Sequence, residues 1–507
     1  TYGQRNQAIG INGTVLNNVN ASPQILTDAY LDTTAMYADL LRPYGIRVWL
    51  SVNFASPMAL AATQTADPLE PAVQHWWQDQ VDDIYRRIPD FGGFIVNANS
   101  EAQPRPCDFG RSHAEGANLL ANALRPHGGE VIWRAFVYSA NDPDRAKQAY
   151  IEFASLDGQF APNVIIQIKN GPIDFQPREP ISPLFYAMPR TRLMAELQIT
   201  QEYLGHSNHI AFLAPMWRET LDDIGHLPNL AGYAGVANVG THGCGNLLAE
   251  ANWFAFGRLA ADASLSPDSI AREWTRGTFP SANDSTRAAI ARMLLRSRES
   301  VVDYMMPLGL HHLFSWGHHY GPEPWCDVPG ARADWLPRYY HRADSIGLGF
   351  DRTETTGTSA TTQYPDSMRA LLESLATCPE EYLLWFHHVP WGYTRTWQCC
   401  NVEETLWEHL GRHYQRGVDA VSEMQRLWQG IHGDISDEVF HDIERRLATQ
   451  QHDAQWWRDA CLLYFQTFNG LHWPSTAQPA VSTLDELKRV RIRISNHECA
   501  PLWDGAN

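Results

Sequence analysis

Five charged residues follow four successive apolar stretches of the chain, and their types suit acid–base chemistry on an anionic substrate. Glu101 comes just after GGFIVNAN, Arg134 ends EVIWR, Lys169 and Asp174 follow NVIIQI, and Glu202 follows LMAELQIT. Two carboxyl groups can hydrolyse a glycosidic bond, because one protonates the leaving oxygen while the other activates water or attacks the sugar. Since guanidinium and ammonium groups bind carboxylates, the two cations indicate a substrate with its own negative charge, such as a uronic acid.

Each of these residues also has a purely structural interpretation. An acid at the end of a strand more often caps a loop or pairs with a cation than catalyses a reaction. Arg134 and Lys169 could simply neutralise Asp174 and the two glutamates. The functional interpretation gains weight only if one fold brings all four strand ends to the same place.

The first half of the chain has the pattern of such a fold. Seven short apolar runs alternate with amphipathic stretches, and they cover residues 11–18, 46–54, 92–99, 130–138, 163–171, 193–200 and 233–240. The runs are continuous rather than alternating, which is typical of parallel strands buried on both faces. Helices are expected over 23–43, 70–88, 112–125 and 143–155.

The pattern therefore predicts an α/β fold, a TIM (β/α)8-type barrel that lacks its first strand. Active sites of TIM barrels lie at the C-terminal ends of the strands, which is where the five charged residues fall. We expect residues 1–264 to form this catalytic barrel domain.

After residue 264 the sequence pattern changes from short apolar runs to long amphipathic stretches. We expect residues 265–507 to form an α-helical C-terminal domain. Ser266 and Pro267 are typical of the N-cap and first position of a helix. Further helices are expected over 286–303, 366–376, 402–428 and 436–465, and strand signals are sparse.

Composition excludes several classes of protein. With 44% hydrophobic and 19% charged residues, the chain has enough apolar material for a packed core. A formal net charge of −18 argues against a nucleic-acid partner, which would need a basic surface. No apolar run approaches the roughly 18 residues of a membrane span. The 19 Trp fit either a sugar-binding protein or an aromatic core.

The sequence offers little support for a metal or a cofactor. None of the eight Cys forms a C-x-x-C pair, and Cys399 beside Cys400 is interpreted as incidental packing. Three His-His pairs, at 311–312, 318–319 and 387–388, lack carboxylate partners at ligand spacing. We therefore expect no metal and no cofactor.

The start of the chain leaves its compartment open. It begins at Thr1 without a signal-peptide pattern, and its first residues read as the end of a helix, so we expect further residues upstream. Cytoplasmic and periplasmic or extracellular locations are both compatible with the sequence.

Several long motifs together resemble the α-glucuronidases of glycoside hydrolase family 67. They are INGTVLNNVNA, PDFGGFIVNANSE, FGRSHAEGANLLANAL, GGEVIWRAFVY, NVIIQIKNGPIDFQPREPISPLF, LQITQEYLG, GHHYGP and LWFHHVPW, and they span nearly the whole chain. The resemblance implies an enzyme of xylan degradation, which removes α-1,2-linked (4-O-methyl)glucuronic acid from short xylo-oligosaccharides.

The resemblance also implies roles for the five charged residues. Glu101 matches the general acid of an inverting mechanism, and Asp174 and Glu202 match the carboxylates that hold and activate water. Arg134 and Lys169 match residues that bind the uronate carboxylate.

Beyond these five residues, the resemblance places Trp391, in HHVPW, against the sugar ring. It implies a homodimer formed through the C-terminal helical domain, without metal or cofactor.

The chain departs from the family pattern in three places. The resemblance leads us to expect an N-terminal β-sandwich domain and a first barrel strand with its pocket Trp, which these 507 residues do not include. Asn97 and Asn99 stand where the family usually has Lys and Asp, which removes one cation from the expected uronate site. THGCGN replaces the usual Asp- and Trp-containing motif after the last strand.

Two other functions stay open at this level. A retaining β-glycosidase, such as a xylanase, could use Glu101 and Glu202 alone. A non-catalytic sugar-binding relative of the enzyme would tolerate Asn97. Arg134, Lys169 and Asp174 argue against the xylanase. The intact Glu101, Asp174 and Glu202 argue against the non-catalytic relative.

Overall fold

A seven-stranded parallel sheet forms the centre of the first half of the chain. The computed structural model describes residues 1–98, 104–136, 142–238, 244–317, 319–493 and 502–503. The strands of the sheet are β1 (Gly13–Val15), β2 (Arg47–Val52), β3 (Gly93–Val96), β4 (Glu130–Arg134), β5 (Val164–Lys169), β6 (Arg192–Gln198) and β7 (Leu230–Val236). They pair in chain order, every pair parallel. All seven predicted strands are thus confirmed.

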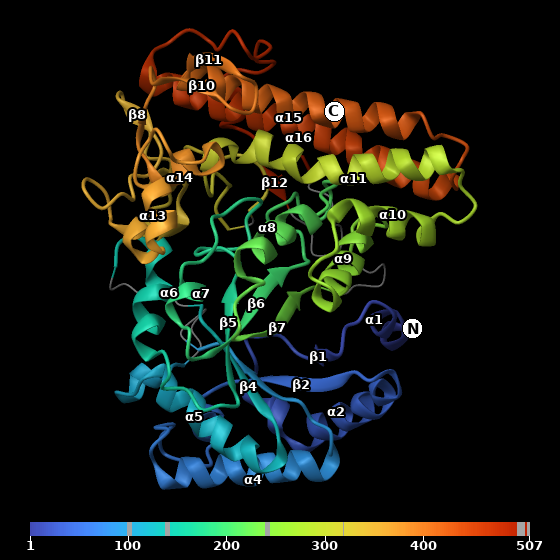
Figure 1. Cartoon of the computed structure of the whole chain (residues 1–507), viewed down its shortest axis with the longest axis vertical. Coiled ribbons are helices and arrows are strands. Elements are labelled where there is room, and N and C mark those ends of the chain that lie inside the picture. Colours follow the sequence, from blue (N-terminus) through green and yellow to red (C-terminus); the bar gives the residue numbers. More distant parts are fainter. Residues whose placement is uncertain (99–103, 137–141, 239–243, 318, 494–501, 504–507) are drawn as a thin grey trace.

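The sheet curls into an incomplete TIM-like barrel with helices around it (Figure 1). Within the described residues, β7 and β1 do not pair, so the sheet stays open between them. The surrounding helices are α1 (Tyr2–Ala8), α2 (Asp28–Leu41), α3 (Ser56–Ala59), α4 (Pro71–Arg87), α5 (His113–Leu124), α6 (Arg145–Phe153), α7 (Leu184–Ala187), α8 (Ala214–Ile224) and α9 (Glu250–Ala261). The predicted helices over 23–43, 70–88, 112–125 and 143–155 correspond to α2, α4, α5 and α6.

Burial explains why the strand sequences are continuous apolar runs. Every residue of β3 and β5 is buried, because the sheet is covered on both faces. One close approach requires glycine. Gly93 opens β3 with φ +139°, and a Cβ there would collide with the carbonyl oxygen of Glu130 on β4.

A helical region follows the barrel. Its helices are α10 (Pro267–Thr278), α11 (Asp284–Met305), α12 (Pro337–His341), α13 (Asp366–Leu372), α14 (Leu383–Phe386), α15 (Leu406–Gln429), α16 (Asp437–Asn469) and α17 (Leu484–Leu487). Ser266 caps α10 by accepting a hydrogen bond from the Ser269 amide at 3.1 Å, as its sequence indicated. Figure 1 shows α11, α15 and α16 side by side at the end of the molecule opposite α4.

Short strands interrupt the helical region, and one pair corrects the sequence prediction. β10 (Thr394–Trp397) and β11 (Val402–Thr405) form an antiparallel hairpin, so the first residues of the helix predicted over 402–428 are strand. Thr405 ends β11 and caps α15. The other short strands are β8 (Gly347–Leu348), β9 (Val389–Pro390), β12 (Ile492–Arg493) and β13 (Leu502–Trp503).

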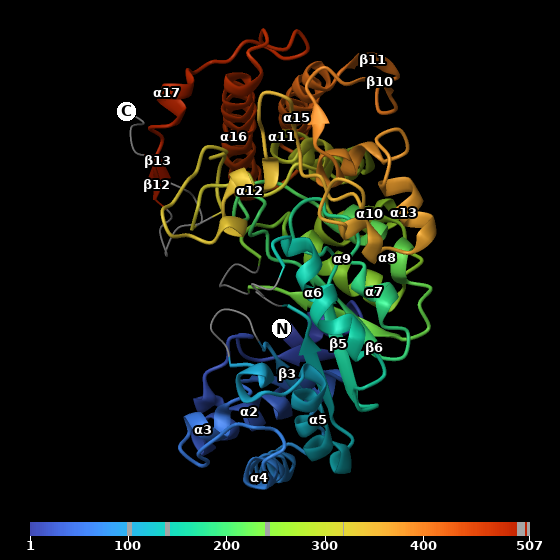
Figure 2. The ribbon, with the colours of Figure 1, turned by 90° about the vertical axis from the view of Figure 1, so that its left-hand side faces the viewer.

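The two regions share one hydrophobic core. In Figure 2 the helical region stands above the barrel. Polar contacts add to the junction: His209 hydrogen-bonds Asp453 of α16 at 2.8 Å, and Arg298 of α11 pairs with Glu219 of α8. Among the described residues, no helix combines the length and apolar character needed to cross a membrane. The boundary between residues 264 and 265 stays a prediction.

Candidate active site

Arg134 lies at the C-terminal end of β4, in a buried ion pair with Glu196 of β6. Its Nε and Nη2 atoms donate to the two carboxylate oxygens of Glu196 at 3.1 and 2.7 Å. Its Nη1 atom donates to Oδ1 of Asn97 at 2.9 Å. Such a two-point contact fixes the guanidinium plane. A substrate carboxylate that binds Arg134 would therefore have to share it with Glu196.

Lys169 ends β5, the neighbouring strand, and pairs with Asp174. Its Nζ atom donates to Oδ1 of Asp174 at 2.6 Å and lies 3.3 Å from the centre of the Phe136 ring. The guanidinium carbon of Arg134 lies 5.7 Å from the centre of the same ring. The structure thus brings both predicted uronate-binding cations to Phe136, each already paired with a carboxylate.

Both oxygens of Asp174 accept strong hydrogen bonds. Oδ1 accepts from Lys169, and Oδ2 accepts from the Tyr203 hydroxyl at 2.5 Å. Burial opposes ionisation of this carboxyl group, but the charges of Lys169 and Arg145 and the two hydrogen bonds outweigh it, so the pKa of Asp174 lies well below its usual range. Asp174 is therefore a carboxylate at neutral pH.

Glu179 accepts hydrogen bonds from the backbone of the loop that carries Asp174. The carboxyl oxygens of Glu179 accept from the backbone N–H groups of Ile173 and Asp174, both at 2.9 Å, and from that of Gln176 at 3.3 Å. Burial raises the pKa of Glu179 to about 8, although these hydrogen bonds act in the opposite direction. Glu179 thus positions Asp174 through the backbone.

Glu202 follows β6 and is the more exposed of the two described acids, with 39% of its side chain accessible against 15% for Asp174. Its Oε1 atom lies 3.0 Å from Nδ1 of His319, and its Oε2 atom accepts from Gln198 at 3.1 Å. The His319 ring stacks on Tyr203, with ring centres 4.9 Å apart. Tyr203 and His319 therefore connect Asp174 to Glu202.

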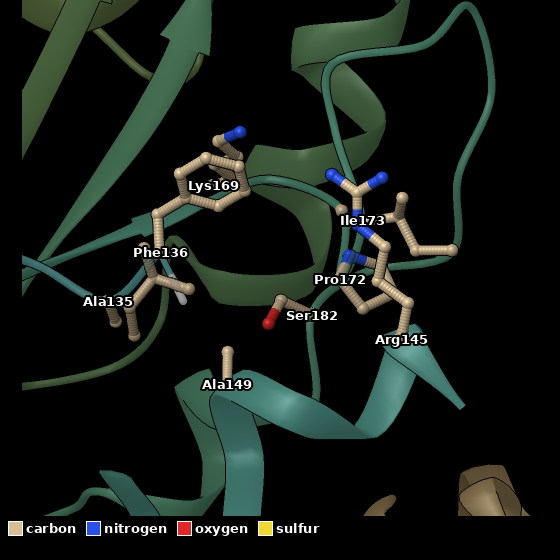
Figure 3. A pocket seen from close by; sticks show the side chains of 10 residues that line it. Ala135, Phe136, Arg145, Ala149, Lys169, Pro172, Ile173 and Ser182 are labelled. Atoms are coloured by element: carbon tan, nitrogen blue, oxygen red, sulfur yellow. The ribbon is translucent and has the colours of Figure 1, made fainter. Parts of the chain in front are cut away.

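A small pocket opens beside these residues at the ends of β4 and β5. Figure 3 shows the Phe136 ring next to Lys169, the Ser182 side chain between Phe136 and Arg145, and Arg145 at the start of α6. Two cationic side chains and an aromatic ring around one hollow suit an anionic ligand that also carries an apolar face.

Comparison with known proteins places this geometry in one family. Residues 1–229 match the Glycosyl hydrolase family 67 middle domain, and residues 244–478 match the Glycosyl hydrolase family 67 C-terminus. The chain belongs to glycosyl hydrolase family 67.

Individual relatives agree with this assignment. The family 67 chain is 41% identical over 498 residues to Alpha-glucuronidase A of Emericella nidulans. The aligned region covers 93% of the chain and 58% of that relative. The chain is 38% identical over 517 residues to an Alpha-glucuronidase of Hypocrea jecorina, covering 97% of the chain and 58% of that relative. The chain thus spans a little over half the length of these curated relatives.

Two of the predicted site residues are not part of the cluster described above. Glu101, the predicted general acid of this family 67 chain, lies outside the described residues, as does Asn99. Trp391 is 4% exposed, donates from Nε1 to the carbonyl oxygen of Asp344 at 2.8 Å, and packs edge-to-face against Trp407 in the helical region. Stacking on a sugar would need an exposed ring face, so the contacts of Trp391 do not support its predicted role, which stays a prediction.

The paired histidines of the family 67 chain have separate partners. His311 and His312 are buried, and they hydrogen-bond Glu179 at 3.3 Å and Gln176 at 2.8 Å. Burial holds the pKa of both histidines well below the ordinary value, so both rings are neutral. Their partners brace the loop that carries Asp174. His318 lies outside the described residues.

Sequence reasoning missed the supporting residues of the site. Glu196 could have been noticed, because a carboxylate inside the apolar run LMAELQ needs a partner within the barrel. Tyr203 directly follows Glu202, but nothing in the sequence directs its hydroxyl to Asp174. His319 lies more than a hundred residues from Glu202, and only the fold joins them.

Proposed function

We propose that this chain hydrolyses the α-1,2 bond between (4-O-methyl)glucuronic acid and the xylose of short xylo-oligosaccharides. The α-glucuronidase names of its relatives support the reaction class. One arrangement carries the proposal: Asp174 and Glu202 stand at the ends of neighbouring strands, connected by Tyr203 and His319, with Lys169 bound to Asp174. This arrangement combines paired acids with a cation at the rim that suits a glycosidase acting on a uronate.

In the proposed mechanism the configuration at the sugar carbon is inverted. Glu101 donates a proton to the glycosidic oxygen as the bond to C1 breaks, and water attacks C1 from the opposite face. We assign the water's proton to Glu202, because both oxygens of Asp174 already accept hydrogen bonds and its pKa is low. Asp174 then orients the water and stabilises the positive charge that develops on the sugar.

Lys169 and Arg134 bind the uronate carboxylate in this proposal. An ammonium group has three N–H donors, and Asp174 takes one of those of Lys169. Phe136 and the nearby ion pair shield the site from water, which strengthens charge-assisted hydrogen bonds. Asn97 adds a polar contact to Arg134 without adding a charge.

We further propose that the helical region forms a homodimer, as the family resemblance implies. Light scattering on the purified chain would give twice the chain mass of 57.3 kDa. A single-chain mass at all concentrations would contradict the dimer without affecting the proposed reaction.

The decisive experiment follows the anomeric protons by NMR while the chain acts on 4-O-methylglucuronosyl xylotriose. We expect release of the β-anomer of the uronic acid first, with unsubstituted xylotriose left intact. Initial release of the α-anomer would indicate a retaining mechanism. Cleavage between xylose units would indicate a xylanase. Binding without release of any sugar would indicate a sugar-binding relative.

A further inference from the structure

A cluster of two cysteines and two histidines lies in the helical region, outside the residues of the proposed site. Cys399 and Cys400 occupy the loop that joins β10 to β11, and His409 and His413 lie one turn apart on α15. The hairpin folds back onto the start of the helix, so residues from the loop and from the helix meet. None of the described cysteines forms a disulfide.

Cys399, Cys400 and His409 form one group of ligand atoms, and His413 adjoins this group through Cys399 and His409. The Sγ atom of Cys399 lies 3.7 Å from Nε2 of His409 and 4.0 Å from Nε2 of His413, and the two Nε2 atoms are 3.1 Å apart. Cys400 shares the cluster, since its Sγ atom and the ligand atoms of Cys399 and His409 all lie within 4.8 Å of one another. Ligand atoms around a tetrahedral zinc ion, with Zn–N of about 2.0–2.1 Å and Zn–S of about 2.3 Å, are separated by about 3.3–3.8 Å.

Each histidine is oriented by a carboxylate on its other ring nitrogen. Nδ1 of His409 lies 2.8 Å from Glu404, and Nδ1 of His413 lies 2.8 Å from Asp303 of α11. This is the outer-shell arrangement that usually accompanies metal-binding histidines, because it fixes the tautomer that offers Nε2 to the ion.

The carboxylates are themselves held in place. Arg412 donates to both oxygens of Glu404 at 2.8 Å, and Arg416 donates to both oxygens of Asp303 at 2.7 and 2.6 Å. The carboxylates that orient the two histidines are therefore themselves fixed by arginine side chains.

The ring of His409 and the cysteine loop are also fixed. Trp397 stacks on His409 with ring centres 3.9 Å apart. Glu380 accepts hydrogen bonds from the amides of Gln398 and Cys399. Asn401 completes the turn with φ +53°.

With Nδ1–H of both rings directed at carboxylates, the two Nε2 lone pairs face each other across 3.1 Å. Such a contact is repulsive unless a cation or a proton lies between the two nitrogens. A proton could be supplied if His413 takes the other tautomer, since Arg416 also lies 2.9 Å from its Nδ1 atom. In that metal-free network Cys399 is a hydrogen-bond partner of the two histidines, whereas an ion would use all four groups as ligands.

We propose that Cys399, Cys400, His409 and His413 bind one Zn²⁺ ion, which fastens the β10–β11 hairpin to α15 and, through Asp303, to α11. Thiolate and imidazole ligands select zinc over hard cations. Four protein ligands leave no open position, so the ion is structural. On binding, each thiol loses its proton to solvent and donates a sulfur electron pair to the ion. Cys399 is exposed, which gives the ion a path of entry.

The test measures zinc in tag-free protein, loaded with Zn²⁺ and passed through a desalting column, by plasma mass spectrometry. We expect about one ion per chain. Cys399→Ser and His413→Ala should lower the affinity at least about 100-fold, and Glu404→Gln about 10- to 100-fold, because it loosens His409. The matched controls, Cys107→Ser and His75→Ala, change exposed residues elsewhere and should keep the ion.

Substitution by Co²⁺ distinguishes the alternatives spectroscopically. A sulfur-to-cobalt charge-transfer band and tetrahedral d–d bands should appear in the wild type and disappear in Cys399→Ser. The melting temperature should fall by several degrees when zinc is removed, and return when it is restored. Retention of less than a tenth of an ion per chain would overturn the proposal, as would Co²⁺ bands equal in wild type and Cys399→Ser. A Cys399–Cys400 disulfide found by mass spectrometry in freshly purified protein would overturn it as well.

Discussion

The Tyr203 hydroxyl donates a 2.5 Å hydrogen bond to Oδ2 of Asp174, and the ring of the same tyrosine stacks on His319, the partner of Glu202. One side chain thus reaches both acids of the proposed site. Burial raises the pKa of Tyr203 well above the ordinary value of tyrosine, so the phenol keeps the proton that it shares with Asp174. The hydroxyl acts on the electrostatics of Asp174, while the ring acts on the position of His319.

Tyr203→Phe separates these two effects, because it removes the hydroxyl and keeps the ring. Loss of a hydrogen bond to a charged group is worth about 1.5–3 kcal/mol, or roughly one to two pKa units for Asp174. Since the folded pKa of Asp174 is depressed, the change must raise it. We expect the acidic limb of the kcat/KM profile to move to higher pH. Tyr85→Phe, which removes a hydroxyl bonded to the Phe91 carbonyl oxygen, should leave the profile unchanged.

Asp174→Asn and Glu202→Gln should differ in their chemistry. If Glu202 is the base, Glu202→Gln lowers kcat by about 10²- to 10⁴-fold, and a small external anion such as azide restores turnover by attacking in place of activated water. Asp174→Asn also removes the negative charge that pairs with Lys169, so its KM should change together with kcat. Rescue of Asp174→Asn by azide and not of Glu202→Gln would reverse the two assignments.

The seven strands and the charged rim could be predicted because burial on both faces of a parallel sheet leaves a strong signal in sequence. The ion pairs among the charged residues at the strand ends could not be predicted. Nothing local indicates that Arg134 binds Glu196, two strands away, or that Lys169 and Asp174 satisfy each other. Such partners depend on strand register. The register of β5 and β6 places Lys169 opposite Glu196, while Arg134 lies on β4, on the other side of β5 from Glu196.

The Cys-His cluster shows a different limit of sequence analysis. Cys399 and Cys400 read as packing because no C-x-x-C spacing surrounds them, and residues 402–405 read as the start of a helix. In the structure those four residues are β11, whose hairpin turns the cysteine loop back over His409 and His413. A helix beginning at residue 402 would have carried the cysteines away from both histidines. The error in one boundary therefore hid the whole site.

Removal of Arg134 should destabilise the fold more than it alters recognition. Arg134→Ala leaves Glu196, 1% exposed, as an unpaired buried carboxylate, which costs about 3–5 kcal/mol. The double variant Arg134→Met with Glu196→Leu should recover most of that loss, because it removes both charges. Urea unfolding measures both. Arg190→Ala, which breaks an ion pair whose arginine side chain is 74% exposed, should cost less than about 1 kcal/mol. A double variant as unstable as Arg134→Ala would contradict this explanation.

Glu101→Gln tests the general acid by its leaving group. Without a proton donor, hydrolysis of xylose-linked substrates should slow by about 10²- to 10⁴-fold, because xylose leaves poorly as an alkoxide. An aryl glucuronide with an acidic phenol needs no such proton and should be hydrolysed at close to the wild-type rate. Initial rates on the two substrates provide the comparison. Equal slowing of both would assign Glu101 a role other than proton donor.

The raised pKa of Glu179 should make the free energy of unfolding depend on pH. Burial is the main reason why its pKa rises to about 8, whereas an unfolded glutamate titrates near 4.3. A carboxyl group with a raised folded pKa binds its proton more tightly in the native state. Its contribution is therefore fully present below about pH 4.3 and is lost as pH rises through 8, by at most about 1.4 kcal/mol per pH unit.

Glu179→Gln cannot titrate, so its free energy of unfolding should vary less between pH 5 and pH 8 than that of wild type, as measured by urea unfolding at several pH values. Glu115→Gln, in the capping box of α5, is the matched control and should keep the wild-type slope. Equal slopes for Glu179→Gln and wild type would show that Glu179 is ionised throughout this range, held as an anion by the backbone amides of residues 173, 174 and 176.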